Sequence, residues 1–199
     1  MNATASPQLR QRHFGAGLVL LLSAKLCGAD PYPVDARFDV EHYRFDLTLS
    51  DVTDRIDVDA RIELRVLDDT VRRFHLDLVG RSTPQADTGM EVHSVAIAGR
   101  SVAYTHRDDR LAIEVPPDTG ADDLLSIDVS YAGVAETGLV IGPNRHGDRS
   151  FFSDNWPNKP RHWLATVDHI GDKATAEFRV TAPSRLQVVS NGLLAERSN

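Results

Sequence analysis

The sequence has little capacity for sulfur or metal chemistry. It contains one cysteine, Cys27, and two methionines in 199 residues. A single thiol cannot close a disulfide within the chain, and a structural zinc site of the thiolate type needs several. The eight histidines include no pair four residues apart, so no H-E-x-x-H motif occurs. We therefore predict no metal-binding residue, no cofactor and no catalytic residue in this chain.

Long apolar runs are also absent. The longest, Phe14 to Ala24, has eleven residues, whereas a helix that crosses a bilayer needs about 20. Arg10 and Arg12 precede it, and the small residues Gly28 and Ala29 follow. This order is typical of a secretory signal peptide. We predict a signal peptide over residues 1–29, a mature chain of residues 30–199 with no transmembrane anchor, and a periplasmic or secreted location.

The mature chain has a deficit of positive charge. Removal of residues 1–29 leaves 19 basic and 29 acidic side chains, which gives a net charge of −10. Binding to nucleic acid depends on clustered lysine and arginine side chains that neutralise phosphates. The composition therefore predicts no nucleic-acid partner.

Helical periodicity is missing, and alternation with a period of two takes its place. Apolar and charged residues alternate from Ile56 to Val66, and a similar pattern runs from Tyr43 to Leu49. The polar turn Ser50 to Asp54 separates them, so the two segments are predicted to form a long antiparallel hairpin. Further strands are predicted at Phe74–Leu78, Val92–Ile97, Leu111–Val115, Leu124–Tyr131, Ala176–Thr181 and Leu186–Ser190.

Turn residues separate these short strands. Ala98-Gly99-Arg100, Pro116-Pro117-Asp118 and Ala132-Gly133 are predicted turns, and the polar segment Arg81 to Gly89 is a predicted loop. Many short strands with regular turns are typical of an all-β fold. We predict an antiparallel β-sandwich or a pair of strongly twisted, saddle-like sheets.

The segment from Phe151 to Phe178 has neither periodicity. It reads FFSDNWPNKPRHWLATVDHIGDKATAEF and holds two prolines and both tryptophans of the chain. Proline fixes the backbone, and tryptophan offers a large apolar surface. The composition predicts a loop that is held in one shape.

This segment resembles the end of the N-terminal domain in zinc aminopeptidases of the aminopeptidase N type, a gluzincin metallopeptidase family. Arg161, Asp168, Lys173 and Ala174 stand at the spacing of that pattern. The opening YPVDARFDVEHYRFDLTLS, Tyr32 to Ser50, is similar to the first hairpin of the same domain. The resemblance covers about residues 32–194 and implies that residues 30–199 are this β domain, truncated at its C-terminal end.

The motifs of the catalytic domain are absent from the chain, because neither H-E-x-x-H nor G-x-M-E-N occurs. The resemblance implies a secreted enzyme that binds zinc and removes N-terminal residues from peptides. On this interpretation the chain lines one side of the substrate cleft and is inactive alone. A missing catalytic domain or subunit is its expected partner, and the peptide binds only to the whole enzyme.

The resemblance also implies roles for particular residues. Asp154 and Trp156 align with a pair that projects into the cleft, where the second member helps to hold the substrate's α-ammonium group. The Asp154 carboxylate can accept hydrogen bonds from an ammonium, whereas the Trp156 indole only donates. The alternative for Asp154 is a cap on the Asn155 to Asn158 turn.

Arg161, Asp168 and Lys173 align with positions that are interpreted as structural, because charged groups in a fixed loop need polar partners.

A second hypothesis belongs to another functional class. The chain could be an autonomous secreted β-sandwich that binds a peptide, a glycan or a protein. It predicts a soluble monomer that unfolds cooperatively, whereas an orphaned domain predicts exposed apolar surface where its partner docks.

Overall fold

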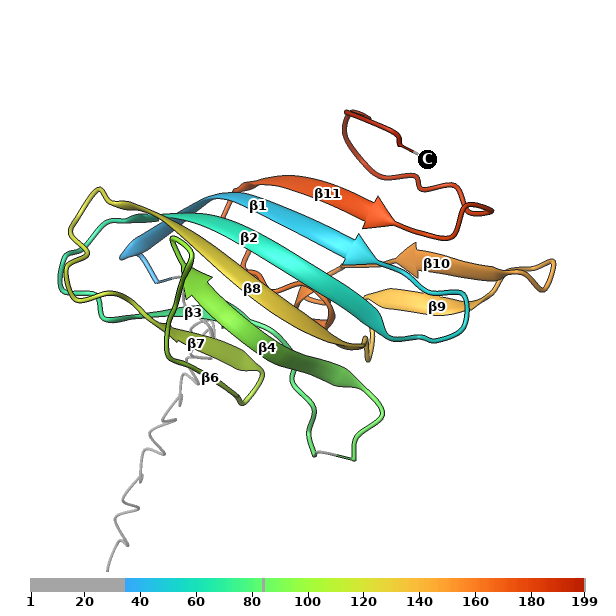
Figure 1. The fold of residues 1–199 in the computed structure, drawn as a ribbon, viewed down its shortest axis with the longest axis horizontal. Helices are drawn as coiled ribbons and strands as arrows, with labels where there is room; N and C mark the ends of the chain where they lie inside the picture. The colour runs from blue at the N-terminus through green and yellow to red at the C-terminus, as the bar shows by residue number, and fades with distance from the viewer. Residues whose placement is uncertain (1–34, 84, 199) are drawn as a thin grey trace, which may run out of the picture. The chain divides into compact units, whose positions relative to one another are not determined.

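The computed structural model describes residues 35–83 and 85–198. The predicted signal peptide, with its cleavage site, lies outside these residues. Eleven strands and one short 3₁₀ helix form the fold (Figure 1). In chain order they are β1 (Phe38–Thr48), β2 (Ile56–Val66), β3 (Arg73–Asp77), β4 (Gly89–Ile97), β5 (Arg100–Ser101), β6 (Tyr104–Arg107), β7 (Arg110–Glu114), β8 (Leu124–Val134), β9 (Leu139–Pro143), β10 (Arg149–Ser153), η1 (Pro160–His162) and β11 (Thr175–Thr181).

The predicted all-β class is confirmed, since the described part of the chain contains no α-helix. Nor does it contain any helix long and apolar enough to cross a membrane.

The largest sheet has six strands in the order β11-β1-β2-β8-β4-β5. Its centre is the predicted hairpin, in which Phe45 lies opposite Ala60 and Tyr43 lies opposite Ile62. Alternate residues of β2 are buried from Ile56 to Val66, as the period of two predicts. One face of this sheet therefore forms the core, and the other carries charged side chains.

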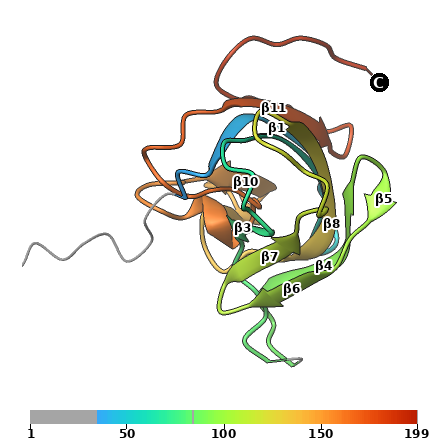
Figure 2. The same cartoon turned by 90° about the vertical axis from the view of Figure 1, so that its left-hand side faces the viewer.

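Two smaller sheets complete the domain. One is three-stranded, in the order β3-β7-β6, and the other pairs β9 with β10. Figure 2 shows the six-stranded sheet curving around β3 and β7. The rings of Phe38 on β1 and Phe74 on β3 meet edge to face with centroids 4.9 Å apart, which links the two layers. The fully buried Leu64, Leu76 and Ile113 belong to the same core.

One strand pair departs from the antiparallel pattern. β11 runs parallel to β1, with Phe45 opposite Phe178. The long connection between β10 and β11 allows this, because parallel neighbours need a crossover rather than a tight turn. β11 lies at the margin of the sheet (Figure 1).

Two local predictions are wrong. Ala132 and Gly133 lie within β8 instead of forming a turn. A Cβ atom at Gly133 would stand 2.2 Å from the carbonyl oxygen of Gly89, so the glycine permits close approach of β4 to β8. Leu186 to Ser190 form no strand. No described strand pairs with them, and an isolated strand has no ladder to stabilise it. The short strands β5, β6, β9 and β10 were not predicted.

Candidate functional site

The predicted site residues all lie in the connecting loop, residues 154–174, which joins β10 to β11. Its middle is anchored in the core, where Trp163, Leu164 and Ala165 are buried. The buried Tyr131 hydroxyl on β8 donates to the carbonyl oxygen of Trp163 at 3.1 Å and accepts from the amide of Ala165 at 3.1 Å. Burial raises the pKa of Tyr131, so the hydroxyl keeps its proton. One side chain thus satisfies two buried backbone groups of the loop.

A second tyrosine holds the following turn. The Tyr43 hydroxyl on β1 accepts from the amide of Val167 at 3.0 Å and donates to Asp172 Oδ2 at 3.1 Å. Burial raises the pKa of Tyr43, and it also raises the pKa of Asp172. The sequence did not predict that either tyrosine binds the loop, because each lies in a regular strand at a position whose pattern indicates only a core residue.

Arg161 and Asp168, two residues of the connecting loop, form an ion pair. Arg161 Nε donates to Asp168 Oδ2 at 2.7 Å, and Arg161 Nη2 donates to the Asp168 carbonyl oxygen at 3.2 Å. The two side chains are 11% and 9% exposed. Asp77 at the end of β3 lies alongside, with Oδ1 3.9 Å from Arg161 Nη1, and its Oδ2 accepts from the Asp168 amide at 3.0 Å. This buried ionic group fastens the loop to the three-stranded sheet.

Lys173 does not join Arg161 and Asp168. The structure shows no ion pair or hydrogen bond of its side chain with any described residue. Its predicted role therefore remains a prediction.

Asp154 and Trp156 lie at the surface, where the chain leaves β10. Asp154 Oδ2 accepts from Lys159 Nζ at 2.6 Å, and its Oδ1 accepts from the Trp156 amide at 3.4 Å. Lys159 and then the Trp156 amide hold the pKa of Asp154 below its ordinary value. These contacts match the capping alternative, while half of the Asp154 side chain still faces solvent. An incoming ammonium would have to compete with Lys159.

Apolar side chains are exposed around this rim. Trp156 precedes Pro157 through a cis peptide bond and is 76% exposed. Phe152 on β10 is 67% exposed and lies opposite Val140 on β9, which is 57% exposed. Large exposed apolar groups are typical of surfaces that contact another protein or domain.

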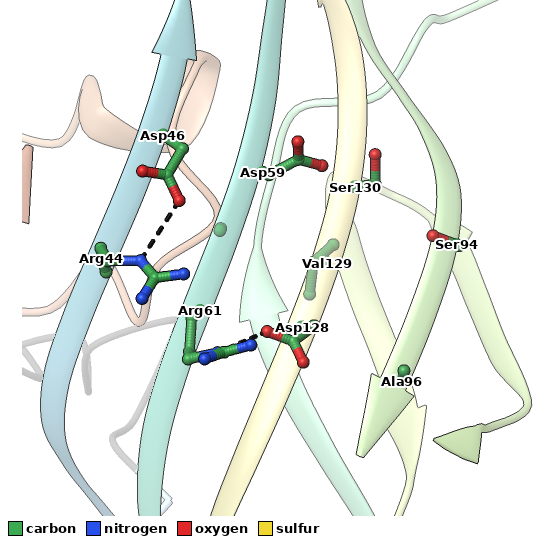
Figure 3. Close-up of a pocket in the computed structure, with 10 residues that line it drawn as sticks. Arg44, Asp46, Asp59, Arg61, Ser94, Ala96, Asp128, Val129 and Ser130 are labelled. Carbon is green, nitrogen blue, oxygen red and sulfur yellow. Dashed lines mark hydrogen bonds and ion pairs between the residues drawn. The ribbon is translucent and has the colours of Figure 1, made fainter. Parts of the chain in front are cut away.

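A shallow hollow of about 180 Å³ lies on the charged face of the six-stranded sheet. Figure 3 shows the ion pairs that line it, Arg44 with Asp46 and Arg61 with Asp128. Their shortest N to O distances are 3.2 and 2.6 Å. Asp59 on β2 lies directly opposite Asp46. The hollow offers hydrogen bonds to a polar ligand, but its cations are already paired with carboxylates.

The residues that the structure describes do not fit a zinc ion. No group of three or more histidine, aspartate or glutamate side chains with metal-binding geometry occurs in residues 35–83 and 85–198.

Comparisons with known proteins establish the fold. No family model and no curated protein matches the sequence. Among solved structures, the M1 zinc metallopeptidase from Deinococcus radiodurans is similar, with a TM-score of 0.66 and 21% identity over 81% of this chain. A mutant of that enzyme bound to a Tyr-Ser-Ala substrate gives a TM-score of 0.67, 23% identity and 82% coverage. Native yeast LTA4 hydrolase gives a TM-score of 0.67, 18% identity and 82% coverage.

The match covers only part of each similar protein. This chain spans 36% of the Deinococcus metallopeptidase and 25% of the yeast hydrolase. The described domain therefore has the fold of a part of these zinc metallopeptidases, as the sequence resemblance predicted.

Proposed function

We propose that this chain is the β domain of a zinc-dependent aminopeptidase and lines the substrate cleft beside a separate catalytic part. The observation that carries the proposal is the shared fold, which covers 81% of this chain and 36% of an M1 zinc metallopeptidase. In this proposal the zinc ion and the catalytic groups belong to the catalytic part, and the chain alone does not hydrolyse peptides.

The exposed rim supports this role. Trp156, Phe152 and Val140 present apolar surface next to the connecting loop, and burial of such surface drives association of domains. The buried ionic group of Arg161, Asp168 and Asp77 holds the same loop in place. A loop that already has its bound shape loses less conformational entropy on docking than a disordered loop does.

Asp154 is the proposed contact for the N-terminal ammonium of a peptide. The pKa of Asp154 lies below the ordinary aspartate value, which is itself far below neutral pH, so the carboxylate is ionised there, and an ionised acceptor makes the stronger hydrogen bond to a cation. Lys159 would have to turn away when the peptide binds.

A chimera tests the proposal. Residues 35–198 replace the structurally matching part of the Deinococcus metallopeptidase, and hydrolysis of Tyr-Ser-Ala is measured with zinc content and circular dichroism. We expect measurable hydrolysis, which falls at least about tenfold when Phe152 and Trp156 are both changed to alanine, because the loss of two large apolar contacts misplaces the domain.

The control is Val52→Ala, since Val52 is 92% exposed in the turn between β1 and β2. It should leave hydrolysis unchanged. A chimera that folds, binds zinc fully and yet hydrolyses nothing would contradict the proposed role.

A further inference from the structure

The two edges of the six-stranded sheet differ. β5 lies at one edge and pairs with only Ala96 and Ile97 of β4, whereas β11 lies at the other edge, presents seven residues and pairs, among the described strands, with β1 alone. Residues 182–198 follow β11 and add no strand to this edge. A long edge strand exposes backbone groups that can pair with another strand. Among the residues that the structure describes, β11 is therefore a long edge strand that is open to a partner.

The free backbone groups of β11 can be identified from its pairing with β1. The Leu49 amide donates to the Thr181 carbonyl oxygen at 2.9 Å, so Thr181 directs its backbone groups toward β1. Backbone direction alternates along a strand. Ala176, Phe178 and Val180 therefore direct their N–H and C=O groups away from β1, toward solvent.

The sequence of β11 is self-complementary. TAEFRVT is nearly symmetric about Phe178, with Thr at both ends, Ala176 and Val180 inside them, and Glu177 and Arg179 next to the centre. When a second copy lies antiparallel with its own Phe178 opposite, the outward-directed residues of both strands meet. Glu177 then lies opposite Arg179 of the partner subunit, and the two-fold symmetry repeats this pair.

The charges also exclude the neighbouring registers. In any other register, outward-directed residues must still pair with outward-directed residues, so the two strands can slide only in steps of two residues. The first step in one direction brings Glu177 opposite Glu177 of the partner subunit, and the first step in the other direction brings Arg179 opposite Arg179 of the partner subunit. Opposite charges across two strands stabilise their pairing and like charges oppose it. If both charged residues of β11 had the same sign, they would oppose pairing of two copies in every register. Because Glu177 and Arg179 have opposite signs, they favour the one register in which they face each other.

The side chains are available for this pairing. Glu177 and Arg179 lie on the charged face of the sheet, with side chains 42% and 57% exposed. They contact each other at 2.8 Å within one chain. Phe178 lies on the opposite face, stacks on Phe45 with centroids 5.5 Å apart and remains 39% exposed. A second Phe178 beside it would cover the exposed edge of the ring.

We propose that two copies of this chain associate through their β11 strands, antiparallel and centred on Phe178, and join their six-stranded sheets into one continuous sheet. The seven-residue ladder buries little surface, so the dimer is weak and depends on protein concentration.

Sedimentation equilibrium over a dilution series tests this proposal. We expect the purified chain to dimerise, and E177R and R179E each to weaken the dimer by about tenfold or more, because each places like charges across the seam twice. An equimolar mixture of E177R and R179E should dimerise again, since opposite charges then face each other. The double variant E177R/R179E should do so by itself.

The matched control is R100E, which makes the same change of charge at the β5 edge and should leave the dimer unchanged. Recovery in the mixture also shows that each single variant is folded. Amide exchange of Phe178 and Val180 should slow only at concentrations where the dimer forms. A wild-type chain that stays monomeric, a dimer insensitive to both reversals, or a mixture that fails to associate would each overturn the proposal.

Discussion

At the residue scale, three polar side chains inside the protein hold the connecting loop in position. The hydroxyl groups of Tyr43 on β1 and Tyr131 on β8 accept hydrogen bonds from buried backbone amides of the loop. Arg161, within the loop, donates to the Asp168 carboxylate. Each contact satisfies a polar group that would otherwise be unpaired inside the protein. An unsatisfied buried polar group costs much more than a surface contact gains. Single substitutions at these positions should therefore have large effects on stability.

Arg161→Met should lower the free energy of unfolding by about 3–5 kcal/mol, because it leaves the largely buried Asp168 carboxylate without its cation and leaves Asp77 with Arg110 alone. Urea unfolding followed by circular dichroism measures the loss. The matched control is Arg61→Met, which breaks an exposed pair with Asp128 and should cost no more than about 1 kcal/mol. Equal losses in the two variants would argue against a buried role for Arg161.

Asp172 gives a prediction about pH. Burial raises its pKa in the folded protein above the ordinary 3.8, so the unfolded chain ionises first as the pH rises. Stability is then lost between 3.8 and the folded pKa, and the loss persists at neutral pH. Asp172→Asn keeps an acceptor for Tyr43 and should be more stable than wild type at pH 7.

The advantage of Asp172→Asn should disappear below about pH 3.8, where the carboxyl group is protonated in both states. Urea unfolding of both proteins at pH 7 and pH 3.5 measures the difference. A stabilisation that does not change with pH would refute this assignment of the cause.

At the element scale, strand pairing depends on close backbone approach at a few positions. β4 and β8 are paired along most of their length, and Gly133 of β8 lies against Gly89 and Met90 of β4. The sequence suggested a turn at Gly133, because glycine is common in turns. The structure shows that this glycine leaves room for a neighbouring strand, which no pattern within β8 could reveal.

Gly133→Ala should destabilise the protein by about 1–3 kcal/mol, because the new Cβ would meet backbone atoms that cannot move without disturbing the ladder. Gly142→Ala in β9 is the control, since nothing lies within 4 Å of its Cβ position. Its effect should be neutral or slightly stabilising, by reduction of chain entropy in the unfolded state. Thermal unfolding of both variants compares them, and similar melting temperatures would contradict the packing argument.

At the scale of the whole domain, stability depends on contact between the curved six-stranded sheet and the three-stranded sheet. Phe74 on β3 is 2% exposed and packs edge to face on Phe38. The period of two predicted which residues of each strand are buried, but it could not predict which sheets face each other. That choice depends on connections between strands far apart in the sequence.

Phe74→Ala should cost about 3–5 kcal/mol and should lower the stability of both sheets together, because it opens a cavity between them. Phe152→Ala is the matched control and should change stability by less than about 0.5 kcal/mol, since Phe152 is 67% exposed. Urea unfolding followed by Trp163 fluorescence in a Trp156→Phe background, and by circular dichroism, should give coincident transitions. Separate transitions would show that the layers unfold independently.

The sequence by itself determined the all-β class, the central hairpin of β1 and β2, most long strands and the presence of a constrained segment between Phe151 and Phe178, whose loop bounds, 154–174, came from the structure. These features follow from local alternation and from rigid residues, which act over a few positions. The tertiary structure alone decided that β11 runs parallel to β1, that Tyr43 and Tyr131 hold the loop, that Asp77 joins Arg161 and Asp168, and that Lys173 stays apart. These outcomes depend on contacts between residues distant in the chain, because burial and hydrogen-bond pairing are settled only when the sheets close around one core.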